Sequence, residues 1–361
     1  MIFSILDKYI GRIVLFSILT MLFLLVSISS IIKFVEQFRK VGEGDYIVFT
    51  AVVFTLLTIP KDIIFFLPMA SMLGTLNGLG SLASNSELVV MQASGFTKLK
   101  IVLSTFKIAI PLIIVIMFIG EWISPVSEQL ARKYRAEKIS KNSLIVTDEG
   151  IWIKDGCNFV HIQHIKNSIS IENISIYFFN KQHQLQSLLF ASNGIYDENR
   201  NLWLLSNINK SIITDEKKII NLKYVFFDWN TTLTPEKLNI IKLNIDSLSI
   251  RGIYKYILYL KENKQNSVMY EITMWKKILI PFSTSVMILM SISFIFGQLK
   301  VISAGIRIIL GILCGFLFYI FNQLITKWGL FYSISPIIAV LIPSMFFLLL
   351  AIFFYRKNIF K

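Results

Sequence analysis

The chain alternates between long apolar runs and one long polar block. An apolar run of roughly 20 residues is long enough to cross the hydrocarbon core of a bilayer. Uncharged runs of about this length lie at residues 13–32, 63–82, 278–299, 308–326 and in the second half of 328–355. A sixth run, 101–123, contains Lys107, which we expect to bend its stem to the headgroup level. The pattern predicts a polytopic α-helical membrane protein with six transmembrane helices, arranged as three before and three after the polar block.

The polar block, residues 124–270, changes to a strand-like pattern. Short segments rich in β-branched and aromatic residues are separated by DG, NG and DENRN turn signals. They predict an inserted antiparallel all-β domain, a sandwich or jelly roll. The predicted domains are therefore 1–123 with three membrane helices, 124–270 with the jelly-roll-like domain, and 271–361 with three more membrane helices. Within the block, residues 247–264 return to helical spacing and predict a helix.

Basic residues predict the orientation in the membrane. Six spans place both termini on one side, where the loops and tails carry Lys8, Arg12, Lys98, Lys100, Lys300, Arg307, Arg356, Lys357 and Lys361. The positive-inside pattern makes that side cytosolic and the β domain external. Before the second span, residues 46–60 are apolar but short. Because Pro60 breaks the helix ladder, we expect a helix along the outer leaflet followed by a turn.

Composition and motifs exclude several kinds of function. Hydrophobic residues make up 55% of the 361 residues, too much for one soluble core. The net charge of +14 comes without a nucleic-acid-binding motif, so we expect an anionic lipid or membrane surface as the partner. The sequence contains no phosphate-binding loop and no hydrolase or zinc motif. His161 and His164 are three residues apart in a predicted strand and should point to opposite faces, which disfavours a metal site.

Two basic clusters are expected just outside the bilayer, where positive charge should be scarce. The first, IIKFVEQFRK, contains Lys33 and Lys40, and the second, ARKYRAEK, contains Arg132 and Arg135. Arginine can bind phosphate oxygens through two donors, so the clusters could hold an anionic lipid headgroup. The alternative is structural: a Glu36 to Lys40 surface pair in the first cluster, and pairs with Glu128 and Glu137 in the second. The sequence leaves both interpretations open.

Residues 84–98, SNSELVVMQASGFTK, lie between the second and third spans and predict a short amphipathic helix on the cytosolic side. Ser84 and Glu87 have capping-box spacing, and Gly95 can end a helix in the left-handed conformation. The apolar side includes Leu88, Val89 and Met91. This side is too short to span the membrane and too apolar for water, so it should press against the membrane or a soluble partner.

This segment resembles the coupling helix of the lipopolysaccharide export permeases, the LptF/LptG family. The segments LDKYIGR, IIKFVEQ, IPKD, FLPMA, IGEWISP and MSISFIFG resemble the same family over nearly the full chain. In that family two sister permeases, LptF and LptG, form a heterodimer above two copies of the ATPase LptB. LptC adds one membrane helix and a periplasmic jelly roll that passes lipopolysaccharide to the bridge protein LptA.

The resemblance implies a non-catalytic permease subunit in the inner membrane of a Gram-negative bacterium. ATP and Mg²⁺ would be bound by the partner ATPase, and no cofactor by this chain. The positions implied to contact the ATPase are Glu87, Leu88, Met91 and Gly95 near residues 84–95. Those implied to meet phosphates or core sugars of lipopolysaccharide are Lys33, Lys40, Lys61, Arg132 and Arg135.

Three alternatives stay open on the sequence alone. The chain could be either sister permease of the family. It could be a mechanotransmission subunit that moves no substrate through its spans, although such proteins usually place their external domain after the first span. It could also be a membrane enzyme that modifies lipid headgroups, but the outer surface offers basic clusters and no clear nucleophile with its base.

Overall fold

The computed structural model describes residues 4–139, 151–155, 158–167, 169–180, 182, 184–197, 200, 202–213, 218–231, 233, 235, 247–263, 265–296, 304–332 and 334–357. The chain forms two compact units. We call the first the helical unit; it comprises Met1–Arg39, Val52–Ala131 and Val268–Lys361. The second, the sheet unit, comprises Lys40–Ala51 and Arg132–Ser267.

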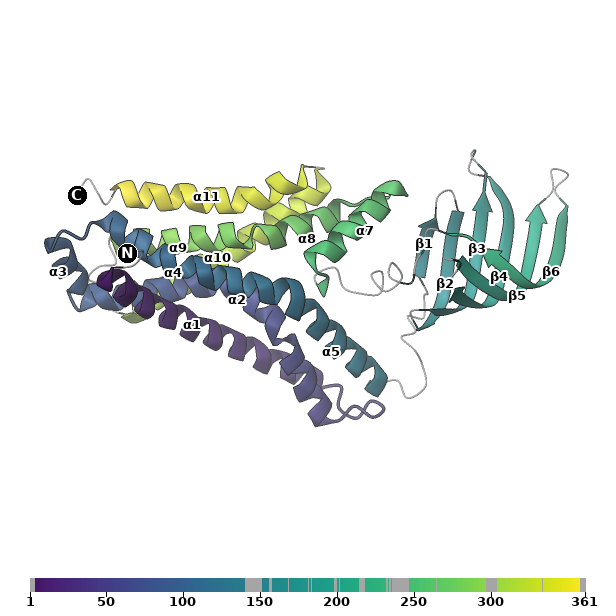
Figure 1. Ribbon diagram of the computed structural model, residues 1–361, viewed down its shortest axis with the longest axis horizontal. Coiled ribbons are helices and arrows are strands. Elements are labelled where there is room, and N and C mark those ends of the chain that lie inside the picture. The colour runs from purple at the N-terminus through teal and green to yellow at the C-terminus, as the bar shows by residue number, and fades with distance from the viewer. Residues whose placement is uncertain are drawn as a thin grey trace. The chain divides into compact units, whose positions relative to one another are not determined.

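Long apolar helices make up the helical unit (Figure 1). The helices of the chain up to the sheet are α1 (Ile5–Phe38), α2 (Val48–Ser84), α3 (Glu87–Ala93), α4 (Lys98–Phe118), the π-helix η1 (Ile119–Ile123) and α5 (Ser124–Ile139). Those after the sheet unit are α8 (Val268–Ile278), α9 (Ile280–Ile295), α10 (Ala304–Phe331) and α11 (Pro336–Lys357).

Five helices of the described chain are long and apolar enough to cross a membrane, or six if α8 and α9 form one span bent by 52°. The chain is therefore a multi-pass membrane protein, and the predicted number of six is the upper of these two counts. The run with Lys107 belongs to a continuous helix, Lys98–Ile139, in which η1 joins α4 to α5. A π-turn widens a helix locally by one residue without ending it.

The turn predicted at Pro60 is wrong, because α2 continues from Val48 to Ser84 with Pro60 and Pro68 inside it. A proline removes one helical hydrogen bond but does not force the chain out of a helix that neighbouring helices hold. The charges of Lys61 and Asp62, which also argued for a break, each have an oppositely charged partner on another helix. The energetic cost of continuing the helix through Pro60, Lys61 and Asp62 is therefore smaller than the sequence indicated.

Glycines in G-x-x-x-G spacing, Gly74 with Gly78 and Gly311 with Gly315, allow α1 and α10 to approach α2 closely. A Cβ atom on Gly74 would lie 2.3 Å from Cα of Ile18 in α1, and one on Gly78 would lie 3.0 Å from Oγ of Ser17. On α10, Gly311 and Gly315 face Leu73 and Met69 of α2 in the same way. These glycines pack helices of this chain against one another, so nothing requires a partner subunit to explain them.

The sheet unit contains an antiparallel sheet of six strands in sequential order, a meander (Figure 1). Its strands are β1 (Ile151–Asp155), β2 (Asn158–Asn167), β3 (Ser170–Phe179), β4 (Leu185–Asp197), β5 (Leu202–Ile213) and β6 (Ile219–Trp229). The DG and DENRN signals begin at the last residues of β1 and β4, whereas the NG signal lies inside β4. Gly194 is needed there for packing, since a Cβ atom would come within 2.9 Å of Ile171, Ile174 and Leu205. The antiparallel sheet is confirmed; a second sheet, as in a jelly roll, stays a prediction.

One face of the sheet holds the core of the sheet unit. Trp203 is fully buried, and its indole N–H donates to the carbonyl of Leu233 at 2.8 Å. Helix α7 (Ile250–Glu262) begins after the cap Ser249, confirming the helix predicted over 247–264. Burial on this helix raises the pKa of Tyr259 well above its usual value. By contrast, the edge strand β6 exposes large apolar side chains such as Val225 and Phe226 on both faces.

Candidate functional site

Helix α3 is shorter than predicted and begins differently. Ser84, predicted as its cap, is the last residue of α2 and donates its hydroxyl to the carbonyl of Ser81. The residue before the first turn is Ser86, which has φ of 63° and makes no side-chain capping bond, so the capping box is wrong. The end is as predicted: Gly95 has φ of 89°, a conformation that glycine adopts without steric cost. Two left-handed residues thus fix α3 between α2 and α4.

The two faces of α3 have different surroundings. Leu88 is 2% exposed and Met91 8%, and both join a core of α1, α2, α4 and α9 side chains that includes Ile10 and Ile101. Val89 and Val90 are 44% and 67% exposed on the other face. The apolar side with Leu88, Val89 and Met91 was predicted to press against the membrane or a soluble partner, but Leu88 and Met91 pack in the bundle of this chain, and of the three only Val89 faces outward. The helix is therefore anchored in the bundle and presents valines outward.

Glu87, at the start of α3, is contacted by two neutral side chains. The phenol of Tyr9 in α1 donates to its Oε2 at 2.7 Å, and the amide of Asn85 lies 3.5 Å from Oε1. Glu87 makes no ion pair within the described part of the chain. A half-exposed carboxylate without a counter-charge, beside exposed valines, can receive a cation from another molecule.

Asp7, two residues before Tyr9, pairs with the lysine that lies inside the apolar α4. Nζ of Lys107 is 2.7 Å from Oδ2 of Asp7, so this lysine is neutralised by an acid of α1. Asp7 also accepts from the hydroxyl of Ser104 and from the N–H of Ser4. Ser4 and Asp7 form the capping box that begins α1. The sequence assigned no partner to Lys107 and no role to Asp7.

The predicted lipid-contacting residue Lys33 lies near the other end of α1. Its Nζ is 2.5 Å from Oδ1 of Asp62 in α2, and Ser29 donates to the other oxygen of Asp62 at 3.2 Å. The Asp62 side chain is 7% exposed, whereas that of Lys33 is 28% exposed. The acid is therefore enclosed by the bundle while the ammonium group reaches the surface.

Lys61 follows the same arrangement with a different acid. Its Nζ lies 3.0 Å from Oε1 of Glu128 in α5, and the side chains are 32% and 4% exposed. Lys61 and Asp62 are adjacent in sequence but point to different sides of α2, since consecutive helical residues do not face each other. Glu128 pairs with Lys61, and its pairing with the arginines of α5, considered above, stays a prediction.

The remaining predicted basic residues belong to the sheet unit. The carbonyl of Lys40 accepts from the N–H of Glu43, and the side chains of Arg132 and Arg135 are half-buried on α5. Burial raises the pKa of Tyr46, and the positive charge of Arg135 opposes this rise. Glu137, the other predicted acid partner, has Lys133 at 3.8 Å. Lys33 and Lys61 lie together in the helical unit, and the other three cations lie outside it.

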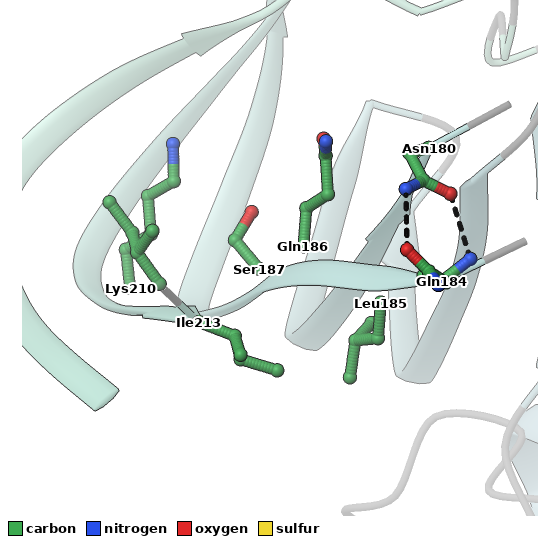
Figure 2. A pocket seen from close by; sticks show the side chains of 8 residues that line it. Asn180, Gln184, Leu185, Gln186, Ser187, Lys210 and Ile213 are labelled. Atoms are coloured by element: carbon green, nitrogen blue, oxygen red, sulfur yellow. Dashed lines mark hydrogen bonds between the residues drawn. The ribbon is translucent and has the colours of Figure 1, made fainter. Parts of the chain in front are cut away.

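A separate hollow of about 400 Å³ lies at one end of the sheet (Figure 2). Asn180 and Gln184 are joined across its rim by two hydrogen bonds of 3.1 and 2.8 Å, and Lys210 points into the same region. Its other lining residues are Leu185, Gln186, Ser187, Ile212 and Ile213. None of the site residues predicted from sequence lines it. The described residues contain no group of three metal-binding side chains, whether here or elsewhere.

The fold and these side chains define a multi-pass membrane protein with a short helix anchored at one end of its bundle and paired cations near the other. The chain belongs to the family of lipopolysaccharide export system permeases LptF/LptG, whose model matches residues 8–357. It is 46% identical over 99% of both chains to the lipopolysaccharide export system permease protein LptG of Escherichia coli K12. It is 45% identical to the LptG protein of Haemophilus influenzae over 96% of both chains. The family resemblance drawn from SELVVMQASGF and the other segments is confirmed.

Sequence reasoning missed Tyr9, Asp7, Ser29 and the roles of Asp62 and Glu128. One signal was available: a charge inside or beside an apolar run needs a partner. Asp7, Asp62 and Lys107 all meet this description. The identity of each partner was not available, because the paired residues lie 29 to 100 positions apart in the sequence.

Proposed function

We propose that this chain is the LptG-type permease subunit of an ABC exporter, which extracts lipopolysaccharide from the inner membrane of a Gram-negative bacterium. It would pair with LptF above two copies of LptB, with both termini and α3 on the cytosolic side. The identity of 45–46% to proteins named LptG supports LptG over its sister. ATP and Mg²⁺ would be bound by LptB, since the sequence contains no phosphate-binding loop.

The observation that carries this proposal is the outward face of α3. Leu88 and Met91 fix the helix in a core shared with α1, α4 and α9, so a force on α3 is passed directly to the spans. Glu87 and the exposed Val90 offer an acid beside an apolar patch, which suits a groove with a basic residue. Closure of the ATPase dimer would move α3 and narrow the cavity between the two permeases.

The opposite end of the bundle would hold the lipid headgroup. Lipopolysaccharide carries phosphates, and Lys33 and Lys61 present ammonium groups on side chains that are about one-third exposed. Lys40, Arg132 and Arg135 would add contacts to phosphates or core sugars. The sheet unit, as a periplasmic jelly-roll-like domain, would accept acyl chains and pass the lipid towards LptC and LptA. The exposed edge of β6 suits strand addition by such a partner.

The test is co-expression of the full chain with candidate LptF and LptB, followed by reconstitution with lipopolysaccharide. Glu87→Lys should abolish stimulation of ATP hydrolysis by lipopolysaccharide, because it places a cation against the proposed basic residue. Glu262→Lys, which reverses an exposed acid on α7, is the matched control and should leave ATP hydrolysis near the wild-type rate. Unchanged ATPase stimulation in Glu87→Lys would refute the coupling role.

The same preparation separates the alternatives. An LptF-type chain would assemble with candidate LptG and not with candidate LptF. A mechanotransmission subunit would stimulate ATP hydrolysis without delivering lipopolysaccharide to LptA. A headgroup-modifying enzyme would return lipid of altered mass. We expect assembly with LptF, transfer to LptA and unaltered lipid.

A further inference from the structure

Two neighbouring ion pairs in the helical unit have the same asymmetric construction. Lys33 pairs with Asp62, and Lys61 pairs with Glu128. In both, the acid is almost enclosed, at 7% and 4% side-chain exposure, while the lysine is 28% and 32% exposed. The pair of Lys107 with Asp7 has the same asymmetry, at 38% and 8%, so what distinguishes the other two pairs is their place at the proposed headgroup end. Here the ammonium groups are left open to a third group.

The acids have fixed positions. Asp62 lies on α2 and accepts from Ser29 and Lys33, both on α1. Glu128 is buried on α5, with 3% of the residue exposed. The lysines, in contrast, have flexible four-carbon stems and three N–H donors each. One donor is directed at the carboxylate, and the others can reach a ligand without the helices moving.

A ligand with phosphate groups would meet two opposing effects at this place. Each ammonium attracts a phosphate, but a carboxylate 2.5 or 3.0 Å from the ammonium neutralises it and repels the incoming anion. The acids therefore lower the affinity of the lysines for phosphate without removing the donors. Such a site binds reversibly, as a transport pathway requires, because a substrate held too tightly is not released.

We propose that Asp62 and Glu128 are positioning residues that compete with a lipid phosphate for Lys33 and Lys61, and so limit how tightly the headgroup is held. This proposal rests on the proposed function, in which the lysines meet phosphates of an exported lipid. When the lipid is present, each ammonium turns part of its donor set to phosphate. When the lipid leaves, the carboxylate takes the ammonium back, so no bare cation remains in the emptied site.

The experiment measures binding of radiolabelled lipid A with two phosphates to the full chain in phosphatidylcholine nanodiscs. Asp62→Asn and Glu128→Gln keep the size and hydrogen-bonding oxygen of each acid but remove its charge. We expect each to bind lipid A about three to ten times more tightly and to release it correspondingly more slowly. Asp62→Glu keeps the charge and should not raise the affinity, and Glu262→Gln, which removes an exposed acid on α7, should behave like wild type.

Thermal unfolding of the same variants separates competition from a structural role. Removing an ion-pair partner should lower the melting temperature of Asp62→Asn while lipid affinity rises, whereas a damaged bundle would lower both. Dephosphorylated lipid A should bind wild type and Asp62→Asn equally. Inorganic phosphate should not displace lipid A at millimolar concentration, and displacement would show that the site binds free phosphate and overturn the lipid assignment.

Lys33→Gln and Lys61→Gln distinguish failure of this inference from failure of the proposed function. If they weaken lipid A binding while Asp62→Asn and Glu128→Gln leave it unchanged or weaker, the acids do not compete and only the inference is overturned. If the lysine variants leave binding unchanged, the headgroup site itself is wrong, and the inference fails with it.

Discussion

The two ends of α1 carry ion pairs of the same design that differ in what else contacts the acid. Near its start, Asp7 pairs with Lys107 of α4 and also accepts from Ser104 of α4 and the backbone of Ser4. Twenty-six residues further along, or about 39 Å on a straight helix, Lys33 pairs with Asp62, whose other donor is Ser29 of the same α1.

This difference separates a structural pair from one that can change partners. The oxygens of Asp7 receive donors from the start of α1 and from two residues of α4, so its removal would leave several groups without a partner. Among the described residues, Asp62 receives donors from α1, namely Ser29 and Lys33. Opening the pair with Lys33 therefore leaves fewer groups without a partner than opening the pair of Asp7.

The largest expected effect comes from removing the acid at each end. Asp7→Ala should destabilise the full chain by about 3 kcal/mol, because it leaves Lys107, the hydroxyl of Ser104 and the N–H of Ser4 without their acceptor. Asp62→Ala should cost about half as much, because it removes the acceptor of Lys33 and Ser29 only. Thermal unfolding in detergent micelles measures both. Equal losses of stability would show that the two ion pairs contribute equally to the stability of the bundle, and the distinction between them would not hold.

The second largest expected effect concerns the packing of α1 against α2, between the two ion pairs. Gly74→Ala would put a Cβ atom 2.3 Å from the backbone of Ile18, so α1 and α2 must separate, at a cost of about 2 kcal/mol. Gly78→Ala is the matched control: its Cβ atom would lie 3.0 Å from the Ser17 hydroxyl, which can rotate away. We expect Gly78→Ala to cost less than about 1 kcal/mol. Losses in the reverse order would mean that the closest approach of α1 lies at Ser17.

Hydrophobic length and strand pattern were enough to predict the membrane helices and the antiparallel sheet, since both depend on local sequence. Turns predicted from local sequence were wrong where tertiary contacts determine the backbone conformation. Pro60 argued for a turn, but packing and the partners of Lys61 and Asp62 keep α2 continuous. Asn193 and Gly194 read as a turn, but close packing against β3 and β5 needs a glycine within β4.

The candidate site was predicted in part. The position of α3 and the left-handed Gly95 followed from the sequence, because a glycine after a short apolar helix has a local physical meaning. The start of the helix did not, because the long apolar α2 extends through Ser84 and removes the predicted cap. Lys33 and Lys61 could be named as cations, but their acids on α2 and α5 could not, because only the folded bundle brings them together.

The smallest expected effect lies at Glu87, where the contact is neutral. The phenol of Tyr9 donates to this carboxylate without cancelling its charge, unlike the lysines that face Asp7 and Asp62. Tyr9→Phe removes the hydroxyl and leaves the charge. If LptB docks on α3 as proposed, this variant should bind purified LptB only about two- to threefold more weakly, because Glu87 is oriented less firmly. Glu87→Gln removes the charge and should weaken the same binding about tenfold or more. Titration of both variants with LptB measures the two losses of affinity. If Tyr9→Phe costs as much as Glu87→Gln, the hydroxyl itself forms part of the docking surface, and the distinction between neutral and charged partners along α1 does not hold.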